Sequence, residues 1–149
     1  MSAATTHEVE EFCAKWKKDV VAFCRMFLGA GAAAEDAASD AFTAFYRERE
    51  LPMTQEIPPR LLSLALRATE KYRNGSSQSL QSASRLERAI QQLPRLERAV
   101  VTMRNLLRME WGALAVASDL SRAEAHKVWM RGIFHLNDLL QKDRPKERH

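Results

Sequence analysis

The sequence predicts an all-α protein built from two small helical domains. Apolar residues recur at steps of three and four along most of the 149-residue chain, the spacing that gathers them on one face of a helix. The sequence lacks the sustained alternation and the β-branched runs that indicate strands. Residues 74–84 are rich in serine and glutamine and carry no charge. We therefore expect a first domain over 1–73, a linker over 74–84 and a second domain over 85–149.

The first domain is expected to contain three helices. The first begins at Thr5 or Thr6 and ends at Gly29, and its apolar stripe comprises Val9, Phe12, Trp16, Val20, Phe23 and Phe27. The second covers about 33–49, with Ala37, Ala38, Ala41, Phe42 and Phe45 on one side and Glu35, Asp36 and Asp40 on the other. The third opens at Pro59 and has four basic positions, Arg60, Arg67, Lys71 and Arg73.

The second domain is expected to contain four helices. Two of them begin at capping boxes, Ser84 with Glu87 and Ser121 with Glu124, in which side chains satisfy backbone N–H groups. Pro94 opens another helix, and a short one covers about 110–118. The inward positions of the first two helices are expected to be Leu86, Ala89, Ile90, Leu93, Leu96, Val100, Met103 and Leu107.

A helix-turn-helix is indicated by residues 111–131, which read WGALAVASDLSRAEAHKVWMR. In such a unit the N-terminal part of the second helix enters the DNA major groove. Its side chains Arg122, His126, Lys127 and Arg131 could then reach guanine edges or phosphates. A plain helical hairpin within a bundle has the same periodicity, so the pattern alone leaves both interpretations open.

Charge is distributed unevenly along the chain. Residues 1–59 hold six basic and ten acidic side chains, a net of −4, whereas residues 60–149 hold seventeen basic and nine acidic, a net of +8. This split indicates two surfaces for two kinds of partner, the basic one suited to nucleic acid, unless the solvated helices simply differ in charge. In the acidic second helix, the helix dipole accounts for Glu35 and Asp36 but not for Asp40.

Several classes of protein are disfavoured by the sequence. The four histidines and two cysteines lack metal-ligand spacing, and no phosphate-binding glycine loop or nucleophile elbow is present. We therefore expect no enzyme activity, no metal and no cofactor. No apolar run approaches the ~20 residues that span a bilayer, and the N-terminus does not resemble a signal peptide. These features predict a cytoplasmic protein without membrane insertion.

Two stretches have a familiar pattern. In FCRMFLGAGAAAEDAASDAFTAFYRE, residues 23–48, a helix ends at Leu-Gly and the next opens with Ala-Glu-Asp. The stretch 86–136 keeps a Leu93-Pro94 pair together with Arg98, Arg104, Ala115, Ser121 and Arg131 in register. In this order they resemble the extracytoplasmic-function (ECF) sigma factors of bacterial RNA polymerase. The resemblance extends from about Phe12 to Leu140.

The resemblance implies a role in transcription initiation. It implies that Glu35, Asp36 and Asp40 dock on the coiled coil of the polymerase β′ subunit, with Phe42 fixing the helix beneath them. The helix that handles the promoter −10 element would carry Arg60, Arg67, Lys71 and Arg73. The helix that reads the −35 element would carry Arg122, His126, Lys127 and Arg131. An anti-sigma protein is implied as a further partner.

Four departures from the family pattern separate two main interpretations. Asp119 stands at a turn where the family usually has glycine, and Arg60 lies near the position where the family tends to have tryptophan. Three positions of the recognition helix, Ala123, Glu124 and Ala125, are often more polar or basic in the family. The linker is short for the family, since its eleven residues extend at most ~40 Å. The chain is then either a divergent sigma factor or a sigma-like regulator with little DNA reading. A helical adaptor unrelated to transcription is a third interpretation. If the two domains pack together, we expect the DNA-reading face to be buried.

Overall fold

The chain is helical throughout the residues that the structure describes. This computed structural model describes residues 6–48, 56–72 and 84–142, and no strand occurs within them. The first half holds α1 (Thr6–Leu28), α2 (Ala32–Glu48) and α3 (Pro59–Tyr72). The second half holds α4 (Arg85–Gln91), α5 (Arg95–Val101), the π-helical turn η2 (Thr102–Leu106), α6 (Trp111–Ser118) and α7 (Arg122–Lys142). The predicted all-α class is confirmed.

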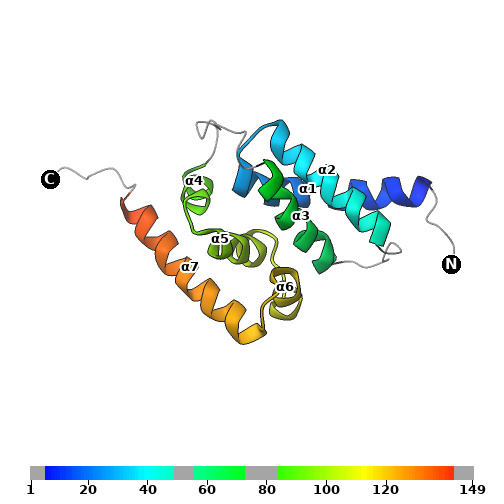
Figure 1. Ribbon diagram of the computed structural model, residues 1–149. Coiled ribbons are helices and arrows are strands. Elements are labelled where there is room, and N and C mark those ends of the chain that lie inside the picture. Colours follow the sequence, from blue (N-terminus) through cyan, green and yellow to red (C-terminus); the bar gives the residue numbers. More distant parts are fainter. Residues whose placement is uncertain (1–5, 49–55, 73–83, 143–149) are drawn as a thin grey trace.

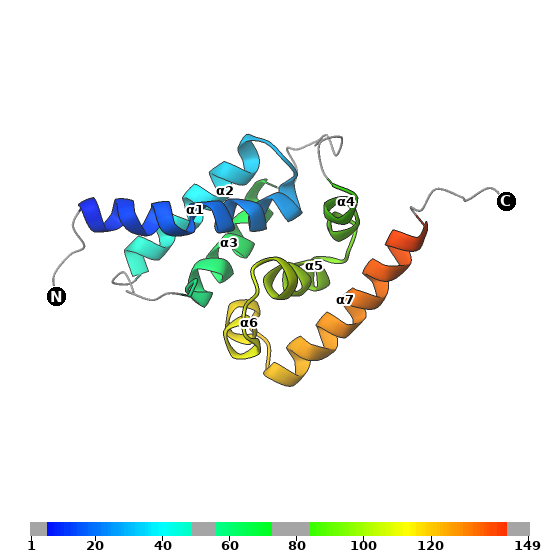
Figure 2. The same ribbon diagram turned by 180° about the vertical axis from the view of Figure 1, so that it is seen from behind.

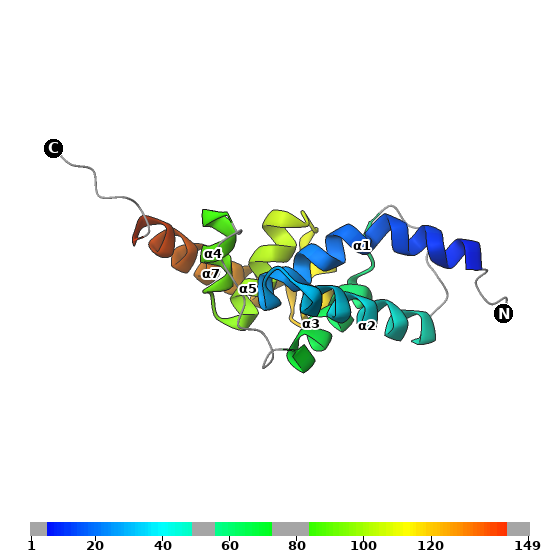
Figure 3. The same ribbon diagram turned by 90° about the horizontal axis from the view of Figure 1, so that it is seen from above.

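The helices form two groups that pack against each other. In Figure 1, α1, α2 and α3 lie on one side and α4 to α7 on the other, and the view from behind shows the same division (Figure 2). Helix α5 lies between α7 and the first group, both in this view and from above (Figure 3). Contacts of α3 with α6 and of α1 with α4 and α5 join the groups.

Aromatic stacking builds the core of the first half. The ring of Phe12 in α1 stacks on Phe45 in α2, with centroids 5.4 Å apart and planes within 4°. Phe42 meets the same ring edge-on at 6.0 Å. These pairs bury the side of α2 that the periodicity predicts to be apolar. Each stacked or edge-on pair of rings stabilises the fold by about 0.5–1.5 kcal/mol beyond the contribution of its buried apolar area. The opposite side of α2 is thereby directed to solvent.

The two halves share one buried core within the described residues. Val100 and Met103 of the second half, both fully buried, belong to the same apolar cluster as Phe23 and Leu61 of the first half. A smaller cluster also crosses the junction, because it joins Met26 of α1 to helices of the second half. The predicted linker lies outside the described residues except for Ser84, so the division into two domains stays a prediction.

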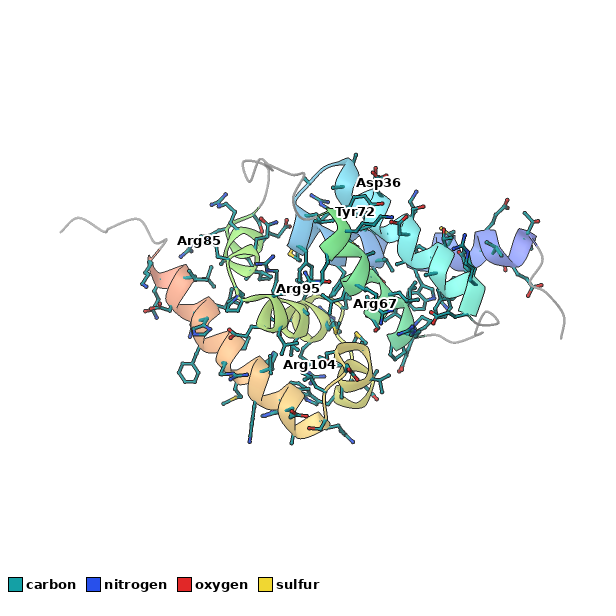
Figure 4. The ribbon with its side chains drawn as sticks, in the orientation of Figure 1. Asp36, Arg67, Tyr72, Arg85, Arg95 and Arg104 are labelled. Carbon is teal, nitrogen blue, oxygen red and sulfur yellow. The ribbon has the colours of Figure 1, made fainter. Side chains whose placement is uncertain are left out.

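Arginine side chains of α5 close the junction between the halves. The guanidinium carbons of Arg95 and Arg98 lie 5.0 and 5.2 Å from the ring centroid of Phe27 in α1. Arg95 also donates to the hydroxyl of Thr69 in α3 (3.0 Å) and pairs with Glu70 (Nε to Oε1, 3.4 Å). Figure 4 shows Arg95 directed from α5 toward the first half. The packing of the halves is therefore held by directional contacts as well as by apolar burial.

The capping box and turn predicted for the helix-turn-helix are present. The Ser121 hydroxyl accepts from the Glu124 N–H and the Glu124 carboxylate accepts from the Ser121 N–H, both at 3.1 Å. The backbone bond holds the pKa of Glu124 below its usual value. Asp119 ends α6 in the left-handed conformation (φ 59°, ψ 43°), as expected for an aspartate at this position. The sequence thus sets the angle between α6 and α7 locally.

Ser121→Ala is expected to lower the free energy of unfolding by about 1 kcal/mol, because it leaves a backbone N–H of α7 without its cap. Urea unfolding followed by circular dichroism measures this change. The threonine variant, which keeps a hydroxyl acceptor, is the matched control and should lose much less. If the alanine variant were as stable as the wild type, the capping box would not contribute to the stability of α7.

The helix that follows Pro94 differs from the prediction. It is regular only over α5 and then widens into η2, where the Leu107 N–H bonds to the carbonyl of Thr102 (3.0 Å). The inward assignment of Leu96 was wrong, since this side chain is 40% exposed, and Leu86 in α4 is 42% exposed. Whether Leu86 and Leu96 are buried depends on how the helices pack on one another, and the periodicity of a single helix does not report that packing.

Close contact between α5 and α7 depends on Gly132. A Cβ added there would lie 2.7 Å from Cγ2 of the fully buried Val101 and 3.4 Å from Cβ of Glu97. His135, one turn along α7, binds the Glu97 carboxylate and ties the same two helices. Because so short a distance to a branched, packed side chain cannot be relieved by a rotamer change, only glycine permits this crossing.

Gly132→Ala is expected to destabilise the protein by about 1–2 kcal/mol in urea unfolding, because overpacking outweighs the helix propensity gained. Gly112→Ala in α6 is the matched control, since a Cβ there meets nothing within 4 Å. The control should be neutral or stabilising. A Gly132→Ala protein at least as stable as the wild type would contradict the proposed crossing.

Candidate functional site

Acidic side chains lie at the start of α2. Glu35 and Asp36 are exposed in or next to the first turn, on the side facing away from the aromatic core. Asp40, one turn on, is engaged within the first half: its Oδ2 accepts from the Tyr72 hydroxyl at 2.6 Å and lies 3.4 Å from Nζ of Lys71. This bond to Asp40 raises the pKa of Tyr72 to about 12. The freely presented acidic patch is therefore Glu35 and Asp36.

Phe42 is not a surface residue. Its side chain is 5% exposed and packs on Phe12 beneath the acidic face. Phe42 therefore lies beneath the acidic residues and does not contact a partner directly, and any part it has in partner binding is to hold α2 in place. It supports the helix from below, as the apolar periodicity of α2 indicates.

A basic groove runs between α2 and α3. Arg67 and Lys71 of α3 line it together with Arg47 and Asp40 of α2 and with apolar residues that include Ala44 and Leu64, and its volume is about 570 Å³. Arg67 is exposed and its place on α3 is seen in Figure 4. Sequence analysis missed Arg47, although it follows Asp40 by two helical turns and so lies on the same side of α2.

Arg60, another predicted basic residue of the first half, does not line this groove. Arg60 forms a two-pronged ion pair with Glu48 at the end of α2, with distances of 2.7 and 3.3 Å. The pair joins α2 to α3 and raises the pKa of Arg60. Arg60 therefore has a structural partner, which the linear sequence did not reveal. Arg73 lies outside the described residues.

The outer face of α7 is basic and open. All four predicted side chains, Arg122, His126, Lys127 and Arg131, are exposed. The expectation that packed halves would bury this face is therefore wrong. The junction instead places a cleft of about 230 Å³ beside α3, lined by Arg67 and Glu70 of the first half and by Arg95 and Asp119 of the second.

An aromatic group supports the outer face of α7. The rings of Trp111 and Trp129 lie 5.6 Å apart at 83°, and the His126 ring lies 4.9 Å from the first and 6.0 Å from the second. The guanidinium of Arg104 lies 4.7 Å from the Trp111 ring centroid, and the position of Arg104 between α5 and α6 is seen in Figure 4. Sequence analysis did not connect these residues, because η2 and the turn before α6 bring them together.

The described residues form neither a membrane-spanning helix nor a metal-binding cluster. No helix there is long and apolar enough to span a bilayer. No group of three or more histidine, cysteine or carboxylate side chains within 6–48, 56–72 and 84–142 could hold a metal ion.

The arrangement of helices was compared with known proteins. No protein-family model matches the chain, and no curated protein matches it. A solved structure, that of CnrH in complex with the cytosolic domain of CnrY, matches with a TM-score of 0.79 and 18% sequence identity. The match covers 95% of this chain and 92% of that chain. The chain has an ECF sigma-like fold. At this identity the similarity establishes the ECF sigma-like fold and not the activity.

Proposed function

We propose that the protein is an ECF-type sigma factor that directs transcription initiation by binding core RNA polymerase and promoter DNA. The observation that carries the proposal is the ECF sigma-like fold over 95% of the chain, combined with an exposed basic face on the second helix of its helix-turn-helix. Such a protein acts by binding and positioning, and we propose no catalytic reaction for it. It would work in the cytoplasm, where polymerase and promoter are found.

The surfaces are assigned to partners by their charge. Glu35 and Asp36 form the polymerase-binding patch that meets the β′ subunit, with Asp40 setting the position of α2 through Tyr72. Arg67 and Lys71, joined by Arg47, line the groove for the −10 element. Arg122, His126, Lys127 and Arg131 face the −35 element. Phosphate contacts supply most of the affinity and base contacts the choice of site.

A regulatory partner is part of the proposal. CnrH was solved with the cytosolic domain of CnrY bound, and we propose that an anti-sigma protein likewise binds this chain. A partner that stabilises the contacts of Arg95 with Thr69 and Glu70 would hold the two halves together. Such a partner would act by restricting the approach of DNA to α3.

A second candidate function is a sigma-like regulator that binds polymerase or an anti-sigma protein and reads little DNA. The narrow cleft between α3 and the α6–α7 turn favours it, because Arg67 faces Asp119 there and promoter DNA would have to displace the second half. Ala123 at the start of α7 also offers no hydrogen bond to a base.

The deciding experiment is capture of core RNA polymerase by the purified full-length protein, followed by salt-titrated promoter binding of the captured complex. Polymerase binding with promoter-specific retention of DNA is expected for a sigma factor. Polymerase binding without DNA retention would support the regulator. Absence of polymerase binding would contradict the sigma factor, and the regulator would then have to act by binding an anti-sigma protein.

A further inference from the structure

His126 is held in place although it is exposed. Its imidazole packs against Trp111 of α6 and Trp129 of α7, at 4.9 and 6.0 Å between ring centroids. Both indoles are themselves half-buried against the core. A histidine in the second turn of an exposed helix face would otherwise rotate freely about its side-chain torsions. Here two rings limit the orientations it can adopt.

The two indoles are fixed in turn by η2. The Trp129 Nε1–H donates to Oδ1 of Asn105 at 2.8 Å. Arg104, the preceding residue, covers the Trp111 ring and donates to the backbone carbonyl of Met109 at 2.8 Å. Adjacent residues of one π-helical turn therefore hold both rings on which His126 rests. Single π-helical turns within α-helices are frequent at functional sites.

A fixed imidazole differs in kind from its basic neighbours. Lys127 and Arg131 are long side chains that bind phosphate on any sequence. A neutral imidazole presents one donor and one acceptor at defined positions. A polar side chain that is already ordered loses little entropy on binding, and in the major groove it can favour one pattern of base-edge donors and acceptors over another.

We propose that His126 is a specificity-determining residue of the DNA-reading helix, and that Asn105 acts through Trp129 as the positioning residue that fixes its orientation. This inference rests on the proposed DNA-binding function and identifies which of its exposed residues reads a base. Lys127 and Arg131 supply affinity, whereas His126 supplies discrimination between sequences.

The test uses the full chain in complex with core RNA polymerase. The probe is the duplex that the wild-type complex selects from a random-sequence library, compared with a scrambled duplex of equal length. His126→Ala is expected to lower the ratio of the two affinities roughly tenfold, the loss of one good base contact. Affinity for the scrambled duplex and the salt dependence should stay within about twofold, because no phosphate contact is removed.

Variants of Asn105 separate positioning from folding. Asn105→Leu removes the acceptor for the Trp129 indole and should lower the affinity ratio toward that of His126→Ala. Asn105→Asp keeps an acceptor oxygen and should restore the ratio. Without DNA, ring-current shifts of the His126 imidazole protons in NMR spectra should be large in the wild type and reduced in Asn105→Leu.

Two results would overturn the inference alone. One is an unchanged affinity ratio in His126→Ala while the wild-type complex discriminates between the duplexes. The other is a wild-type His126 with the proton shifts of a free histidine. A wild-type complex that selects no sequence would instead contradict the proposed DNA-binding function, and with it the inference.

Discussion

Replacing Lys127 and Arg131 with alanine is expected to weaken DNA binding by the polymerase complex on the order of 100-fold at moderate salt. Both side chains are exposed on the outer face of α7. Each phosphate contact that is lost should reduce the slope of log affinity against log salt by about 1. The slope should therefore fall by about 2 for the double variant. Affinity titrations at four or more salt concentrations measure both quantities.

Lys142→Ala is the matched control for this variant. Lys142 is an exposed lysine of the same helix, but it lies at the C-terminal end and pairs with Asp138 at 3.0 Å. Its removal should leave DNA affinity and salt slope unchanged. Alanine favours helix at all three positions, so the stability of α7 should be retained. A double variant with the wild-type salt slope would exclude Lys127 and Arg131 from phosphate binding.

Replacing both Glu35 and Asp36 with arginine is expected to reduce binding to core RNA polymerase by at least about 100-fold. The arginines would meet the surface that the proposal pairs with these carboxylates, and like charges placed against each other cost several kcal/mol. Both carboxylates are exposed and lie at the N-terminal end of α2. The arginines would also oppose the helix dipole, at about 0.3–1 kcal/mol each. Helicity should be retained, because the aromatic core beneath α2 is untouched.

Asp40 is deliberately left out of this double variant. Its replacement would break the bond to Tyr72, which joins α2 to α3, so a loss of binding would have two explanations. The control reverses Glu10 and Glu11 on α1, which are exposed and change the net charge equally. Polymerase capture followed by quantitative blotting compares the two variants. Equal binding by both would show that the α2 patch is not the polymerase contact.

Local sequence features predicted most of the helices and their ends. The steps of three and four in α1 and α2, Pro59 at the start of α3, and the Ser121–Glu124 box all act within a few residues, so one sequence is enough to find them. The same holds for Asp119, whose left-handed conformation follows from its side chain and its place after α6. The predicted helix periodicity, the start of α3 at Pro59 and the Ser121–Glu124 box are confirmed.

The predicted roles of individual charged residues depended on partners distant in sequence. Arg60 pairs with Glu48 across twelve residues, and Asp40 with Tyr72 across thirty-two. Arg47 joins the groove of Arg67 and Lys71 only because α2 and α3 pack side by side. Periodicity assigns a side chain to a face of its own helix, but it does not say which helix lies opposite.

The sequence by itself determined that this protein is helical, where most of its helices begin, and that an acidic helix in the first half precedes a basic helix in the second. Those properties follow from backbone capping and from the amphipathic period of single helices. Only the tertiary structure decided that the halves share a core through Val100 and Met103, and that α7 stays open. It also decided that His126 rests on two indoles held by η2. Such contacts join residues far apart in the chain, and packing geometry, not local preference, selects them.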